Sequence, residues 1–370
     1  MTNLHTDHTK RHEFVLLFDV ENGNPNGDPD AGNLPRIDPE TMHGIVTDVA
    51  LKRKVRDYLQ MTKGIDIFIQ SETALNRLIF DAAEKEGFKP LRIELKEDEE
   101  DVIEWFKENS GDDFVLDGLT LTCVIESQKD QDIKKTFNAV EDAELKKKLI
   151  LIAKRLVQED SAKKTGTKKK LDEETKIKTR QRLIDTYYDI RLFGAVLATG
   201  LNAGQVRGPL QFTFAKSIDP IVRLDLSITR KAVTKEEDKK RKENEMARKS
   251  IVPYGLYRAH GFYNPYLAKK DIKSSEYNIT SEDLGNLWEA LTNMFEYDHS
   301  AARGQMSTRG LYVFTHENDK GNAPSHKLFK RIAVTQKECA RKFEDYMPIT
   351  IDEAGLDKLG VHLTKIVHEV

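Results

Sequence analysis

The chain contains the apolar run Phe14-Val-Leu-Leu-Phe18 and, shortly after it, the turn-rich stretch Asn22-Gly-Asn-Pro-Asn-Gly-Asp-Pro-Asp30. A short apolar run bounded by turn residues is typical of a buried strand, and Gly, Pro, Asn and Asp favour tight turns. Loops that are held by rigid elements often carry function. The pattern therefore predicts a strand that ends in a functional loop at the rim of the fold.

This loop leads into a predicted basic helix that begins near Thr41. At about 100° per residue, one apolar face is bordered by a basic arc. The apolar face comprises Ile45, Val49, Val55 and Leu59, and the arc comprises Lys52, Arg53 and Arg56. Charged groups whose stems are packed lose less entropy when they bind an anion, so the arc suits phosphate. Taken alone, the arc is explained more simply as a solvated helix face, because charged residues are the default on such a face.

Composition places few limits on function. With 370 residues, of which 38% are hydrophobic, the chain is expected to form about two domains, or one domain with large insertions. The formal net charge is only -3, so any nucleic-acid contact would come from local basic patches.

The distribution of cysteine and apolar residues points to a cytoplasmic protein. Cys123 and Cys339 are not arranged as a zinc site or a disulfide framework, which fits a reducing compartment. The stretch Met1 to His12 is polar, and the sequence has no apolar segment long enough to span a membrane. We therefore expect no membrane partner.

The first half of the chain is predicted to open β-α-β-α. Ile65 to Gln70 has the pattern of a second strand, and a helix follows from about Glu72 to Gly87. An acidic stretch from Arg92 to Asp113 and a strand-like run from Leu119 to Ile125 come next. The helix predicted over Leu145 to Val157 is amphipathic, since Leu149, Ile152, Ala153 and Leu156 share one face.

The strongest basic patch runs from Lys163 to Arg182 and carries nine Lys or Arg against three acidic residues. A nucleic-acid contact and a solvated loop both explain it.

The second half of the chain predicts a projecting hairpin. Leu210 to Lys216 and Ile221 to Thr229 are strand-like, and Ile218-Asp-Pro between them favours a turn. The charged segment Lys231 to Ser250 is expected to be an exposed insertion. A core helix and a strand then follow, marked by Leu284, Leu287, Trp288, Leu291, Met294 and Phe295 and by Leu311 to Thr315.

Catalytic and metal-binding patterns are weak. Asn22, Asn24, Asn26 and Gly27 imitate the start of a calcium loop, but Asn33 stands where a bidentate Glu is required. Acidic residues in the loop could serve a nuclease together with a neighbouring histidine, although Asp beside Gly and Pro is also the ordinary composition of turns. The candidates are Asp28, Asp30, Asp38 and His43. P-loop, dinucleotide-binding and GxSxG motifs do not occur.

Several motifs in a fixed order now identify a family. They are Phe18-Asp-Val-Glu-Asn-Gly-Asn-Pro-Asn-Gly-Asp-Pro-Asp30, Asp189-Ile-Arg-Leu-Phe-Gly194, Val206-Arg-Gly-Pro-Leu-Gln-Phe212, Ser217-Ile-Asp-Pro220 and Tyr254-Gly-Leu-Tyr257. Together they resemble the backbone subunit of the type I-C CRISPR Cascade complex, a Csd-type member of the RAMP superfamily. The resemblance runs from about residue 12 to about residue 330.

The resemblance implies an α+β fold with an RRM-like (ferredoxin-like) palm, finger-like insertions and a thumb hairpin. The expected palm comprises 12–90, 119–126, 185–216 and 282–330. The expected fingers are 91–182, the thumb hairpin and charged insertion 200–260, and the C-terminal segment 331–370.

The same resemblance implies a non-catalytic binder of guide RNA, without cofactor or metal, that polymerises in multiple copies along crRNA. Pairing of the guide with target DNA then supplies sequence specificity in antiviral defence. The implied partners are crRNA, target DNA, further copies of the chain and the large, small and crRNA-processing Cascade subunits. Two other readings stay open: a nuclease, as in type III relatives whose site this chain does not match, and a scaffold without nucleic acid whose basic patches form salt bridges between subunits.

A backbone-tracking groove needs Arg and Lys on rigid elements. The RNA-binding candidates are Arg36, His43, Lys52, Arg53, Arg56, Arg207, Lys216, Arg303 and Arg309. The DNA-binding candidates are Lys163, Lys164, Lys168, Lys169 and Lys170.

Overall fold

The computed structural model describes residues 3–71, 73–109, 113–125, 130–162, 172–198, 201–230, 245–271, 274–335 and 340–369. The chain divides into two compact units, Met1–Ile65 with Gly208–Val370, and Asp66–Arg207. Of the ranges expected for the palm, 66–90, 119–126 and 185–207 lie in the second unit.

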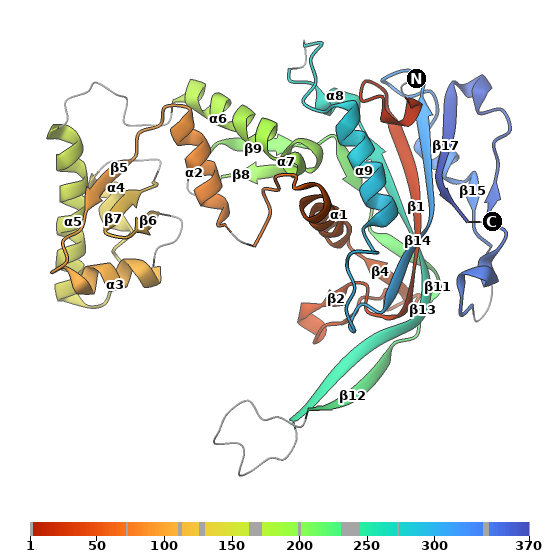
Figure 1. The fold of residues 1–370 in the computed structure, drawn as a ribbon, viewed down its shortest axis with the longest axis horizontal. Helices are drawn as coiled ribbons and strands as arrows, with labels where there is room; N and C mark the ends of the chain where they lie inside the picture. The colour runs from red at the N-terminus through yellow and green to blue at the C-terminus, as the bar shows by residue number, and fades with distance from the viewer. Residues whose placement is uncertain are drawn as a thin grey trace. The chain divides into compact units, whose positions relative to one another are not determined.

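The first unit is built on an antiparallel sheet in the order β17-β14-β1-β13-β11-β4 (Figure 1). The central strand β1 (His12–Gly23) pairs antiparallel with β13 (Glu245–Tyr263) on one side and β14 (Gln305–His316) on the other. The outer strands are β17 (Val361–His368), β11 (Ala215–Pro220) and β4 (His43–Val46).

The β1 strand is buried on both faces, which explains its unbroken apolar run. On one face Phe14 packs edge-on against Trp288 of α9 (Ser281–Asn293), with ring centroids 5.2 Å apart. On the other face Val15 and Leu17 belong to a cluster with the C-terminal segment. That segment holds α10 (Ser325–Phe329), β15 (Ile332–Ala333), η4 (Phe343–Tyr346), β16 (Thr350–Ile351) and η5 (Asp357–Leu359). The predicted core helix and the strand over 311–315 are thus confirmed.

A long two-stranded ribbon corrects the predicted hairpin. Instead of pairing with each other, the segments over 210–216 and 221–229 lie in succession along β13. They form β10 (Leu210–Phe212), β11 and β12 (Leu224–Arg230). The prediction of a turn at Ile218-Asp-Pro was wrong, because these residues lie within β11, where the register to β4 shifts. Proline beside a bulge can end a ladder without reversing the chain. Of the predicted insertion, 231–244 lies outside the described residues and 245–250 belongs to β13.

The basic helix begins later than predicted. It is α1 (Asp48–Lys63), capped by the Thr47 side chain, which accepts a hydrogen bond from Ala50 N at 3.3 Å. Ile45 lies in β4 and Val49 is exposed, so the predicted apolar face was partly wrong. The buried apolar side chains of α1 are Leu51, Val55, Tyr58 and Leu59. Ile65 to Gln70 is not a strand, which also corrects the β-α-β-α opening.

The second unit contains two hydrophobic clusters. One lies among α2 (Leu75–Lys85), α6 (Glu173–Thr186), α7 (Tyr188–Phe193), β8 (Gly194–Leu197) and β9 (Gly204–Arg207). The other lies among β5 (Leu91–Glu94), α3 (Glu100–Asn109), β6 (Phe114–Asp117), β7 (Thr120–Cys123), α4 (Asp130–Lys135) and α5 (Ala143–Ala162). The predicted amphipathic face of α5 is confirmed, since all four of its residues are buried. Among the helices that the structure describes, none is long and apolar enough to cross a bilayer.

Short elements complete the first unit. They are η1 (Leu4–Thr6), β2 (Gly27–Asp28), η2 (Pro29–Ala31), β3 (Leu34–Pro35) and α8 (Pro265–Ala268).

Candidate nucleic-acid interface

The turn-rich loop after β1 is held tightly against the segment before β14. Asn24 N donates to Ala302 O at 2.8 Å. A Cβ at Gly23 would lie 1.8 Å from the carbonyl oxygen of Arg303, and one at Gly304 would lie 2.3 Å from Glu21 O. Only glycine permits this approach, which explains why both turns carry it.

The same loop is also anchored to the start of α1. Asn26 Oδ1 accepts a hydrogen bond from Thr47 N at 2.9 Å. Asn33 has a left-handed backbone (φ 64°), and its N–H donates to Asp28 O at 2.7 Å. The asparagines therefore form the turn itself, and they place it beside the helix.

A hollow of about 360 Å³ lies between this loop, α1 and the residues before β14. Its walls carry the cations Arg53, Lys54 and Arg303 and the carboxylates Asp57 and Asp298. The rest of its lining includes Asn24, Pro25, Asn26, Gly27 and Asn33. A rigid turn and clustered cations on a fixed helix are the features that a phosphate-binding surface needs.

Each of these cations is held by an internal acid. Asp298 forms ion pairs with both Lys54 and Arg303, and Arg53 Nε donates to Asp57 at 2.7 Å. Burial, followed by repulsion from Arg303, lowers the pKa of Lys54 to about 8, whereas Asp57 acts in the opposite direction. The hollow thus holds cations in place, and a bound phosphate would share them with the two acids.

The other predicted residues of this region lie around the loop and α1. Arg36 pairs with Asp28 at 3.4 Å, and Lys216 pairs with Asp38 at 3.3 Å. The side chain of His43 has a buried Nδ1 without a hydrogen-bond partner among the described residues.

The remaining members of the predicted basic arc are less accessible than expected. Lys52 pairs with Asp48 at 2.9 Å, one turn away. Arg56 is only 5% exposed, so its charged group is not the free head that the sequence suggested.

Three sets of candidates lie elsewhere. Arg309 is clamped between Asp19, at 2.9 Å, and Glu369. Arg207 is exposed at the end of β9 in the second unit. The five lysines proposed for DNA lie outside the described residues.

Sequence reasoning missed Lys54 and Asp298. The misplaced start of α1 hid the role of Lys54, because the apolar face was assigned through Ile45 and Val49. The capping residue Thr47 is the signal that would have set the helix correctly. Nothing local in the sequence connects Asp298 to this helix, because the two are far apart in the chain.

The loop carboxylates stabilise turns by accepting hydrogen bonds from nearby backbone N–H groups. Asp28 Oδ1 accepts from Asp30 N at 3.2 Å, and Asp38 accepts from Glu40 N at 3.1 Å. A hydrogen bond from the Thr41 hydroxyl, with smaller contributions from other donors, lowers the pKa of Asp38 to about 2. In the described part of the chain, no three His, Cys, Asp or Glu side chains are grouped to hold a metal ion.

Asp189 of the Asp189–Gly194 motif is structural. It is buried and accepts hydrogen bonds from Phe68 N at 2.8 Å and Ile69 N at 3.1 Å. It thereby satisfies the backbone of the segment that the sequence had suggested to be a strand.

Comparison with known proteins identifies one family. A family model described as CRISPR-associated protein Cas7 matches residues 10–352. A CRISPR-associated protein Cas7 from Haloferax volcanii is 48% identical over 60 residues, which cover 16% of this chain and only 17% of that relative.

Two solved structures are also similar over most of the chain. A chain of a CRISPR RNA-guided surveillance complex in a pre-nicking state is 15% identical, with a TM-score of 0.48, and covers 90% of this chain and 85% of its own. A second CRISPR RNA-guided surveillance complex is 12% identical, with a TM-score of 0.41 and coverages of 93% and 92%.

Proposed function

This chain belongs to the family of CRISPR-associated protein Cas7, and from that premise we propose that it is a non-catalytic backbone subunit that binds guide RNA in a type I-C Cascade complex. Copies of the chain assemble along one crRNA and present it for pairing with target DNA. The large, small and crRNA-processing subunits are its other partners.

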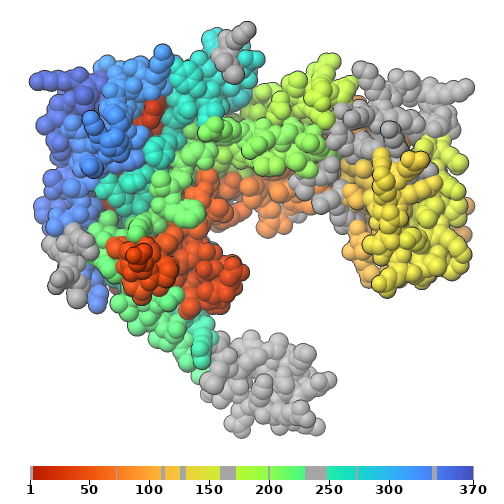
Figure 2. All heavy atoms as spheres, turned by 180° about the vertical axis from the view of Figure 1, so that it is seen from behind, coloured from red at the N-terminus to blue at the C-terminus, as the bar shows by residue number. Residues whose placement is uncertain are grey.

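The topology of the first unit supports an RRM-like palm. Strands β14, β1, β13 and β11 are adjacent in that order and are antiparallel. Helix α1 lies in the connection from β1 to β11, and α9 lies in the connection from β13 to β14. This order matches the β-α-β-β-α-β sequence that a ferredoxin-like palm would have, with the second unit inserted between α1 and β10. The ribbon of β12 and β13 stands out from this sheet and supports the assignment of a thumb (Figures 1 and 2).

The single observation that carries the proposal is the hollow lined by Arg53, Lys54 and Arg303. Its cations come from a helix and from a loop that is held in place by the close backbone contacts at Gly23 and Gly304. Binding of an RNA sugar-phosphate backbone requires no groups that recognise the bases. Sequence-independent binding of this kind suits a subunit that must accept any guide.

The test is to purify the full chain together with its partner subunits and a CRISPR array, and to extract and sequence any bound nucleic acid. Uniform repeat-derived RNA is the expected result. An assembled particle without RNA would reject the proposal in favour of a scaffold. Heterogeneous short fragments that become uniform in Asp28→Ala would favour a nuclease.

A further inference from the structure

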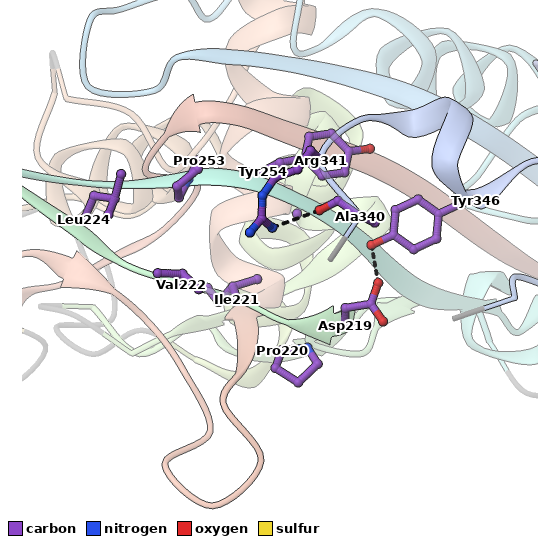
Figure 3. Close-up of a pocket in the computed structure, with 11 residues that line it drawn as sticks. Asp219, Pro220, Ile221, Val222, Leu224, Pro253, Tyr254, Ala340, Arg341 and Tyr346 are labelled. Carbon is purple, nitrogen blue, oxygen red and sulfur yellow. Dashed lines mark hydrogen bonds between the residues drawn. The ribbon is translucent and has the colours of Figure 1, made fainter. Parts of the chain in front are cut away.

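A pocket of about 200 Å³ lies where the ribbon leaves the sheet, against the C-terminal segment (Figure 3). One wall is aliphatic and consists of Ile221, Val222, Leu224 and Pro253. The facing wall carries Arg341 and Tyr346. It is distant in the sequence from the hollow described above and shares no lining residue with it.

The pocket continues into an apolar stripe along β12. Alternation in a strand places Leu224, Leu226 and Ile228 on one face, where Leu224 lies opposite Ile251 and Leu226 lies opposite Lys249 of β13. Together with Val222, these side chains are 38 to 56% exposed. From Val222 to Ile228 the stripe is about 20 Å long, at roughly 3.3 Å per residue.

The other face of the ribbon is polar. Asp225 lies opposite Ser250 and accepts a hydrogen bond from its hydroxyl, and Ser227 lies opposite Arg248. A two-stranded ribbon has little stability alone, and contiguous exposed apolar surface is typical of an interaction site. The apolar face is therefore the side that a partner covers.

The charges at the pocket select the partner's chemistry. The carboxylate of Asp219 already accepts the Tyr346 hydroxyl (Figure 3). Among the described residues, the exposed Arg341 guanidinium donates to its neighbour's carbonyl, Ala340 O, at 3.1 Å and has no acid within ion-pair distance. The pocket thus offers one available cation beside an aliphatic wall.

The shape of the walls favours a protein over a nucleic acid. Nucleobases bind by stacking on aromatic faces. Here Tyr254 and Tyr346 are both buried, and the accessible wall is aliphatic and proline. We propose that this pocket and the adjoining stripe dock a protein segment that presents a bulky apolar side chain next to a carboxylate.

The test uses the full-length chain and labelled, capped hexapeptides of Gly and Ser with a central Phe-Asp or Phe-Asn pair, in fluorescence anisotropy. The Phe-Asp peptide should bind about tenfold more tightly, as one charge-assisted hydrogen bond allows. Arg341→Gln should remove that difference, and Val222→Asp should weaken both peptides. Arg248→Gln, on the polar face, is the control and should change neither.

Four results would overturn the proposal, and three of them concern ligand binding. The first is equal binding of the two peptides, and the second is no binding of either. The third is that hexauridylate displaces the Phe-Asp peptide and that Arg341→Gln weakens RNA binding as much as it weakens peptide binding. Light scattering distinguishes a second copy as the occupant: a dimer of the native chain that Leu226→Lys makes monomeric would also overturn it. Because Arg341 is exposed, unchanged thermal unfolding of Arg341→Gln verifies that the variant folds.

Discussion

The double variant Arg53→Gln with Arg303→Gln tests the hollow most quantitatively. Each arginine is taken to neutralise one phosphate, and each phosphate contact contributes about 0.7 to the slope of log affinity against log salt for a single strand. Losing two contacts should lower the slope by about 1.4. Extrapolated from about 1 M salt, affinity should fall about fifteenfold at 0.15 M and about sixtyfold at 0.05 M.

The assay is fluorescence anisotropy of a labelled single-stranded RNA titrated with the full chain over a series of salt concentrations. A matched control is Arg77→Gln with Arg92→Gln in the second unit. Arg77 pairs with Asp81 one turn away, as Arg53 does with Asp57, and the two arginines are 41 and 39% exposed. Arg92 and Arg303 are both 46% exposed.

Partly exposed ion pairs contribute about 0 to 1 kcal/mol, so neither double variant should change unfolding greatly. The reasoning is refuted if the hollow variant keeps the native salt slope, or if the control variant loses as much slope as the hollow variant.

Four further predictions concern pH and stability. The pKa of Lys54 is lowered to about 8, so RNA affinity should fall between about pH 7 and pH 9 as this lysine loses its charge. The same anisotropy assay should show no such fall for Lys54→Met. The same pH dependence in both proteins would mean that Lys54 does not bind the RNA. The depressed lysine pKa also means that its contribution to the free energy of unfolding rises with pH between about 8 and 10.5. Gly23→Ala should lower the free energy of unfolding in urea by about 1 to 3 kcal/mol, since its Cβ would meet the Arg303 carbonyl. Gly285→Ala, in open space on α9, is the control and should raise it by up to about 1 kcal/mol. Equal effects of the two variants would contradict the close approach at Gly23. Asp189→Ala should cost about 2 to 5 kcal/mol by thermal or urea unfolding, because two backbone donors lose their acceptor, and a loss below about 0.5 kcal/mol would reject that role.

Patterns that depend on local burial were predictable from the sequence. The run at Phe14 to Phe18 gave a strand because both faces of β1 are covered, and the periodicity of α5 and α9 matches their buried faces. The loop after β1 was predicted from its turn residues to be a functional rim; it lines the hollow, and its function stays a prediction.

What could not be predicted depends on contacts between distant segments. The partner of β12 is β13, beyond a long charged stretch, so the nearer Ile218-Asp-Pro turn was preferred wrongly. The hollow joins α1 to Asp298 and Arg303, and local periodicity carries no information on that pairing. The exposure of a charged side chain likewise depends on tertiary contacts, and Arg56, which was expected to be accessible, is buried.

The most direct test of the central claim is ultraviolet crosslinking of RNA to the purified assembly, followed by mass spectrometry of the linked peptides. The account predicts that crosslinks gather on the loop from Asn24 to Gly27, on the turn of α1 around Arg53, and on the segment from Asp298 to Arg303. Crosslinks confined to other surfaces, with these three peptides unmodified in an RNA-loaded particle, would contradict it.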